Sequence, residues 1–187
     1  MNGPPDDELA ADALVAHAAF LRTLHDETGR TIGLALEPEP ACRLETGDDA
    51  VDFFERMVFR RERVTRYAAL TGLAGAAAEE SLRRHLGVCL DTCHAAVEFE
   101  DTDRSIDRLE AAGIRILKIQ LSAGLSVRPA TRDRVAALRP FADDVYLHQV
   151  VIREGAEASR FVDLPDALAR GATGADPLVG DGAGILT

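Results

Sequence analysis

The sequence predicts an α/β fold in which about four parallel strands alternate with helices, and three observations lead to it. Short aliphatic runs alternate along the chain with segments whose apolar residues recur at helical spacing. Hydrophobic residues make up 47% and charged residues 28% of the 187 residues, which is a globular composition. Because helices separate successive strands, the strands are expected to be parallel, with right-handed crossovers.

The expected elements follow one another at regular intervals. Helices are predicted where apolar residues recur every three or four positions, and strands where aliphatic runs lie between breaks. The helices are expected at 7–26, 48–69, 76–85, 102–112, 131–138 and 164–170. The strands are expected at 31–37, 86–91, 114–122 and 145–151. The composition turns to glycine and alanine near the end, so a loose tail, 171–187, is expected after a single domain, 1–170.

Each predicted strand has one aliphatic face and one face of small or polar residues. The second kind of face ends in a polar side chain in every strand, namely Glu37, Asp91, Gln120 and His148. A sheet covered by helices on both sides is usually apolar on both faces. The alternation therefore favours part of a (β/α)8 barrel, with these side chains at the C-terminal rim where barrel active sites lie.

The loop after the second strand carries the strongest chemical signal. Asp91 ends an apolar run, and His94 follows three residues later. A carboxylate and an imidazole that converge on one loop suit a metal ion or a polar substrate. The same residues also suit a structural role, with Asp91 as a helix cap and His94 packed in the core. Both interpretations stay open on these residues alone.

Charge and cysteine content restrict the class of protein. The net charge of −11 disfavours nucleic acid as a partner, because phosphate binding relies on clustered Lys and Arg. No apolar run reaches the roughly 20 residues that a membrane span needs, and the first residues lack the features of a signal peptide. Cys42, Cys89 and Cys93 are too few for a disulfide framework. The expectation is a cytoplasmic protein with reduced thiols and no membrane insertion.

Four stretches, 34–40, 90–100, 118–122 and 145–150, together resemble the xylose isomerase-like superfamily of TIM barrels. That superfamily includes sugar isomerases and epimerases and endonuclease IV, and the segment from Gly87 to His94 matches its strand-end motif well. Within it, the chain is most similar to the EboE family of metabolite-traffic proteins, over roughly residues 10–170. The resemblance implies a small-molecule metabolite as partner and a divalent metal (Zn, Mn or Fe) as cofactor.

The resemblance also assigns roles to the rim residues. It implies Glu37 and Asp91 as metal ligands and His94 as a ligand or a substrate contact. Gln120 stands where many members have a histidine, and its amide oxygen is a weaker ligand than imidazole. His148 lies near a second histidine position, which the endonuclease branch uses.

Catalytic and substrate-binding residues follow from the same likeness. In sugar isomerase chemistry a metal polarises a substrate oxygen while a carboxylate, here Glu37 or Glu39, moves a proton on the neighbouring carbon. Lys118 is a further catalytic candidate and faces the same interior, where it holds an anionic substrate or pairs with Glu37. Tyr146 replaces the acid usual in the endonuclease branch and is expected to contact the substrate.

Four strands are fewer than the eight of a complete barrel, which typically has about 250 residues. The chain is therefore expected to be a truncated form whose open strand edges favour self-association. The function expected is metal-dependent, isomerase-like or epimerase-like handling of a small metabolite. The alternatives are a catalytically silent binding or scaffold protein and a metal-dependent phosphodiesterase of the endonuclease IV type.

Overall fold

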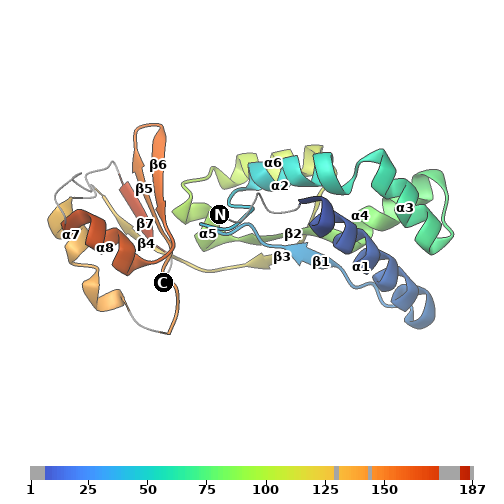
Figure 1. The fold of residues 1–187 in the computed structure, drawn as a ribbon, viewed down its shortest axis with the longest axis horizontal. Coiled ribbons are helices and arrows are strands. Elements are labelled where there is room, and N and C mark those ends of the chain that lie inside the picture. Colours follow the sequence, from blue (N-terminus) through green and yellow to red (C-terminus); the bar gives the residue numbers. More distant parts are fainter. Residues whose placement is uncertain (1–6, 129–130, 143–144, 173–181, 186–187) are drawn as a thin grey trace. The chain divides into compact units, whose positions relative to one another are not determined.

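The structure is a computed structural model that describes residues 7–128, 131–142, 145–172 and 182–185 (Figure 1). These residues have a mixed α/β fold, as the sequence predicts, and divide into two compact units. Unit 1 is formed by described residues of Met1–Pro38, Gly47–Leu90 and Asp103–Ile119. Unit 2 is formed by those of Glu39–Thr46, Asp91–Thr102 and Gln120–Thr187. A single domain was predicted because periodicity within a segment does not show with which distant segment it packs.

The helices of unit 1 agree closely with the predicted ones, apart from one interruption. They are α1 (Asp7–Thr28), α2 (Gly47–Phe53), α3 (Arg61–Thr71), α4 (Gly75–His85) and α6 (Thr102–Ala111). The predicted helix at 48–69 is interrupted by the π-helical turn η1 (Phe54–Val58) and by an extended Arg60. Phe54 and Val58 are fully buried there, so the turn places two large side chains in the core.

A three-stranded parallel sheet completes unit 1, in the order β1 (Leu34–Leu36), β2 (Leu86–Asp91) and β3 (Arg115–Gln120). β1 and β2 pair in parallel, with Leu34 opposite Leu86 and Leu36 opposite Val88. A methyl group at Gly87 would overlap the carbonyl oxygen of Arg115, so glycine is needed for β3 to approach β2. These strands are three of the four that the sequence predicts.

Unit 2 is built on an antiparallel sheet. Its strands lie in the order β4 (Leu125–Val127), β7 (Gly182–Ile185), β5 (Val150–Glu154) and β6 (Glu157–Phe161). Its helical segments are α5 (Thr92–Val97), α7 (Arg132–Ala136), the 3-10 turn η2 (Arg139–Phe141) and α8 (Leu164–Ala172). The core of the unit consists of Val135, Leu138, Val150, Ile152, Leu164, Ala167 and Leu168.

The strand predicted at 145–151 is wrong in position and in pairing. Val145 and Leu147 are 75% and 60% exposed, and the strand is β5, which begins at Val150. Gly155, with φ +58°, and Ala156 form a two-residue hairpin loop that joins β5 to β6. Because glycine adopts this positive φ readily, the chain turns back here instead of crossing over through a helix. The fourth predicted strand is therefore antiparallel to its neighbours.

The predicted loose tail also needs correction for residues 182–185. They form β7, which pairs with β4 on one side and with β5 on the other. This glycine-rich segment has little side-chain surface to bury, but backbone hydrogen bonds to two neighbouring strands stabilise it. The rest of the tail from 173 onward lies outside the described residues. None of the described helices is both long and apolar enough to cross a membrane.

Candidate metal site at the end of β2

The site begins where β2 ends and α5 starts. Asp91 has extended backbone angles, φ −95° and ψ 120°, and is the N-cap of α5. Its Oδ1 accepts the backbone N–H groups of Cys93 at 2.9 Å and His94 at 3.3 Å. An aspartate suits this position because its carboxylate satisfies helix N–H groups that lack a partner in the first turn. The turn thereby brings the side chains of residues 91, 93 and 94 to one place.

Asp91, Cys93 and His94 form a group with metal-ligand chemistry, called here the Asp91 group. One carboxylate oxygen, the Sγ atom and one imidazole nitrogen lie within 4.8 Å of one another. All three residues are buried, with exposed fractions of 6%, 5% and 8%. Among the His, Cys, Asp and Glu side chains that the structure describes, this is the one group of three or more so arranged. The sequence predicts Asp91 and His94 as metal-site residues, whereas for Cys93 it predicts only a reduced thiol.

Gln120, the last residue of β3, and Ser122, two residues later, both donate hydrogen bonds to the carboxylate of Asp91. The Ser122 hydroxyl donates to Oδ1 at 2.6 Å, and the Gln120 Nε2 donates to Oδ2 at 2.6 Å. The Thr92 hydroxyl donates to the carbonyl oxygen of Ser122 at 2.8 Å. Gln120 thus presents its amide nitrogen to Asp91 and orients it, which differs from the predicted role of its oxygen as a metal ligand. Ser122 was not predicted as a site residue.

The surroundings set the protonation states of the two acidic groups. Burial alone would raise the pKa of Asp91, but hydrogen bonds from the Ser122 hydroxyl and from the thiol and N–H of Cys93 outweigh it. They hold the pKa of Asp91 well below its usual range, so the carboxylate is charged at neutral pH. Burial raises the pKa of the Cys93 thiol, so without a metal this thiol stays protonated at neutral pH.

Three further predicted residues lie in unit 2, outside the Asp91 group. Glu39 accepts a hydrogen bond from the Gln149 Nε2 at 2.5 Å. Tyr146 is 72% exposed. His148 is buried, and its backbone N–H donates to Asp163 Oδ1 at 2.9 Å. His148 precedes an antiparallel strand, so it does not occupy the C-terminal end of a parallel strand as predicted.

The remaining two predicted residues, Glu37 and Lys118, belong to unit 1. Glu37 follows β1 directly and is half-buried. Lys118 lies in β3 and is exposed. Neither is a member of the Asp91 group. Of the five predicted metal ligands, the structure therefore brings together Asp91 and His94, adds Cys93 and places Gln120 against the carboxylate.

Comparisons with protein-family models, with curated proteins and with solved structures found no match for this chain.

Proposed function

We propose that this chain holds a divalent transition metal at Asp91, Cys93 and His94 and binds a small metabolite there. The observation that carries the proposal is the approach of one oxygen, one sulfur and one nitrogen donor within 4.8 Å. Carboxylate, thiolate and imidazole are the three protein ligands of zinc, and a site with three of them keeps a position for water or substrate. Zinc is therefore the first choice, ahead of manganese and iron.

The neighbouring groups fit such an ion. Asp91 is already ionised, and Ser122 and Gln120 fix the direction of its carboxylate, as hydrogen-bonded partners of metal ligands commonly do. Cys93 would lose its proton on binding, so metal uptake is expected to release a proton and to strengthen as the pH rises. When bound, the ion would supply Lewis-acid polarisation of a substrate oxygen.

The resemblance to xylose isomerase-like barrels of the EboE type supports a sugar-like or polyol-like metabolite. The parallel strands β1, β2 and β3 with their helices support the further proposal that the chain corresponds to part of a (β/α)8 barrel. Among the predicted catalytic residues, Glu39 shares unit 2 with the Asp91 group. A carboxylate of this kind would move the proton in an isomerisation or epimerisation.

A second candidate is a catalytically silent binding or scaffold protein in which Asp91 caps α5 and holds no metal. The observation in its favour is that the carboxylate of Asp91 already accepts hydrogen bonds from four donors. These are the N–H groups of Cys93 and His94, the Ser122 hydroxyl and the Gln120 amide. Four donors satisfy a carboxylate fully, and this arrangement suits a structural helix cap that needs no metal.

Elemental analysis of the purified chain, before and after dialysis against zinc, tests the metal site. Near-stoichiometric metal is expected in the wild type, with loss in Asp91→Ala and in Cys93→Ser. Cys42→Ser is the matched control because Cys42 is exposed and outside the Asp91 group. Absence of metal from the wild type, or equal metal in Cys93→Ser, would overturn the proposal in favour of the capping role.

If the metal is present, a turnover assay shows whether the chain is an enzyme or only binds its metabolite. NMR spectra of sugars and polyols incubated with the zinc-loaded chain would show isomerised or epimerised products if the chain is an enzyme. Glu39→Gln is expected to abolish the reaction while leaving the metal content unchanged. Ligand-induced spectral changes without any product would establish binding alone.

A further inference from the structure

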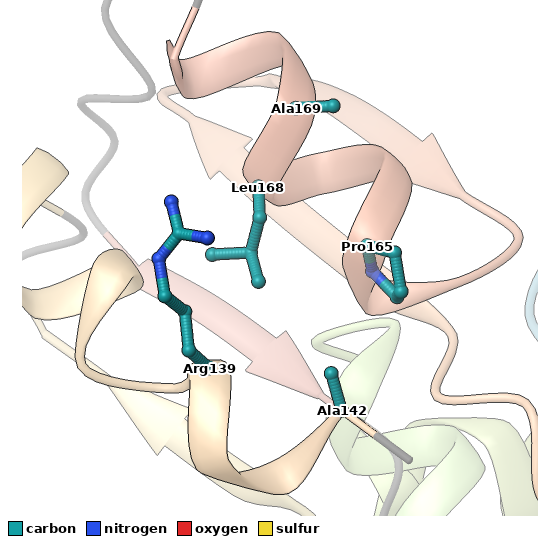
Figure 2. Close-up of a pocket in the computed structure, with 5 residues that line it drawn as sticks. All are labelled: Arg139, Ala142, Pro165, Leu168 and Ala169. Atoms are coloured by element: carbon teal, nitrogen blue, oxygen red, sulfur yellow. The ribbon is translucent and has the colours of Figure 1, made fainter. Parts of the chain in front are cut away.

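A cavity of about 320 Å³ lies between η2 and α8 in unit 2 (Figure 2). It is lined by Arg139, Ala142, Pro165, Leu168 and Ala169. Leu168 also belongs to the hydrophobic core of unit 2, and Ala142 packs against that core. None of the lining residues belongs to the Asp91 group, so the cavity is separate from the proposed metal site.

The cavity joins one cation to an apolar wall. Figure 2 shows the Arg139 guanidinium reaching toward Leu168, with the side chains of Ala142 and Pro165 on other sides of the same space. Arg139 is exposed, and within the described part of the chain no carboxylate forms an ion pair with its guanidinium. The net charge of −11 means that the chain as a whole repels anions. An anionic ligand would therefore bind in this cavity because of the local positive charge of Arg139.

The two parts of the cavity define the chemistry of a ligand. A guanidinium pairs with a carboxylate through two parallel N–H donors, whereas an apolar wall favours a hydrocarbon body. At about 30 Å³ for each water-sized group, a volume of about 320 Å³ holds roughly ten non-hydrogen atoms. We propose that this cavity binds a small monocarboxylate whose apolar body lies against Leu168 and whose carboxylate pairs with Arg139.

Titration of the full chain with 4-methylpentanoate, followed by amide NMR, tests the proposal. The amide signals of Leu168 and Ala169 are expected to shift with a single saturable affinity. The neutral probe 4-methylpentanamide has the same apolar body and is expected to bind about tenfold more weakly, because it lacks the charge that pairs with the guanidinium. Arg139→Gln is expected to weaken binding of the carboxylate by about the same factor and to leave that of the amide unchanged.

Two further variants separate the cavity from general effects of charge. Ala142→Leu places a larger side chain in the cavity from the end of η2, so it should abolish binding of both probes. Arg61→Gln removes an exposed arginine of unit 1 and should leave both affinities unchanged. The proposal is overturned if Leu168 and Ala169 do not respond, or if Arg139→Gln binds the carboxylate as tightly as the wild type.

Discussion

The two units of the molecule differ in how their strands find their partners. In unit 1, β1 and β2 pair in parallel across intervening helices, and the pairing follows the order of apolar segments along the chain. In unit 2, a hairpin at Gly155 joins β5 to its antiparallel neighbour β6. On its other side β5 pairs with β7, which comes from near the end of the chain. The comparison teaches that regular alternation of helices and strands is readable in a sequence, whereas a hairpin depends on one or two turn residues.

The largest effect is expected from the core of unit 2. Leu164 is fully buried within that core, so Leu164→Ala should lower the free energy of unfolding by about 2 to 5 kcal/mol. Hydrogen exchange of the β5 and β6 amides should accelerate accordingly. The exposed Val162 is the control, because Val162→Ala removes apolar atoms that contact water. Equal effects of the two substitutions would mean that this core does not hold the antiparallel sheet.

Next in size is a substitution in the sheet of unit 1. Gly87→Ala places a methyl group on the Arg115 carbonyl oxygen, so strands β2 and β3 must separate, at a cost of about 2 to 3 kcal/mol. In Gly33→Ala the new methyl would meet Leu117 Cδ1 at 2.8 Å, and this side-chain tip can rotate away. Denaturant unfolding should show the larger loss for Gly87→Ala. A reversed order would contradict the close approach of β2 and β3.

A smaller, pH-dependent effect is expected at the junction of β2 and α5. The pKa of Asp91 is lower in the folded chain than its unfolded value of about 3.9, so the ionised carboxylate stabilises the fold above that value. This contribution disappears as the pH falls through the folded pKa. In Asp91→Asn an uncharged amide replaces the carboxylate that accepts from Gln120 and Ser122, so the variant should lose about 1 to 2 kcal/mol at pH 7 and progressively less in acid.

Unfolding free energies measured across the acid range would check that prediction. Asp107→Asn is the control, because Asp107 is an exposed helical residue. The account of Asp91 fails if Asp91→Asn and Asp107→Asn behave alike at neutral pH, or if the loss for Asp91→Asn grows in acid.

The smallest effect concerns the hairpin. Gly155→Ala forces a side chain into a positive φ of 58° and should cost about 1 kcal/mol. Ala156→Gly, at the next position, has no positive φ to relieve and should change stability by less. Thermal unfolding of both variants would show whether Gly155 specifies the turn.

Much of the fold of unit 1 could be predicted from the sequence, because its helices have clear apolar periodicity and β2 is a six-residue strand that is apolar up to Asp91. Unit 2 could not be predicted equally well. β4 has only three residues, and β7 has the sequence Gly-Ala-Gly-Ile, so neither carries a pattern that distinguishes it from a loop. The glycine at position 155 was the available signal for the hairpin, because two-residue hairpin loops favour glycine.

The candidate site was predictable in part for a related reason. Asp91 and His94 follow a buried strand, and their spacing indicated convergence. Cys93 lies between them in the first turn of α5, which places its sulfur in the same group, but a single cysteine without a CxxC pair did not suggest a ligand. The amide orientation of Gln120 depends on its hydrogen bond to Asp91, which only the folded chain reveals.

Cobalt(II) titration is the most direct test of the proposed metal site, because a bound cysteine thiolate gives a charge-transfer absorption in the near ultraviolet. The account predicts this band in the wild type and in Cys42→Ser, saturating near one cobalt per chain, and its loss in Cys93→Ser. Absence of the band from the wild type, or its persistence in Cys93→Ser, would contradict a metal held by Asp91, Cys93 and His94.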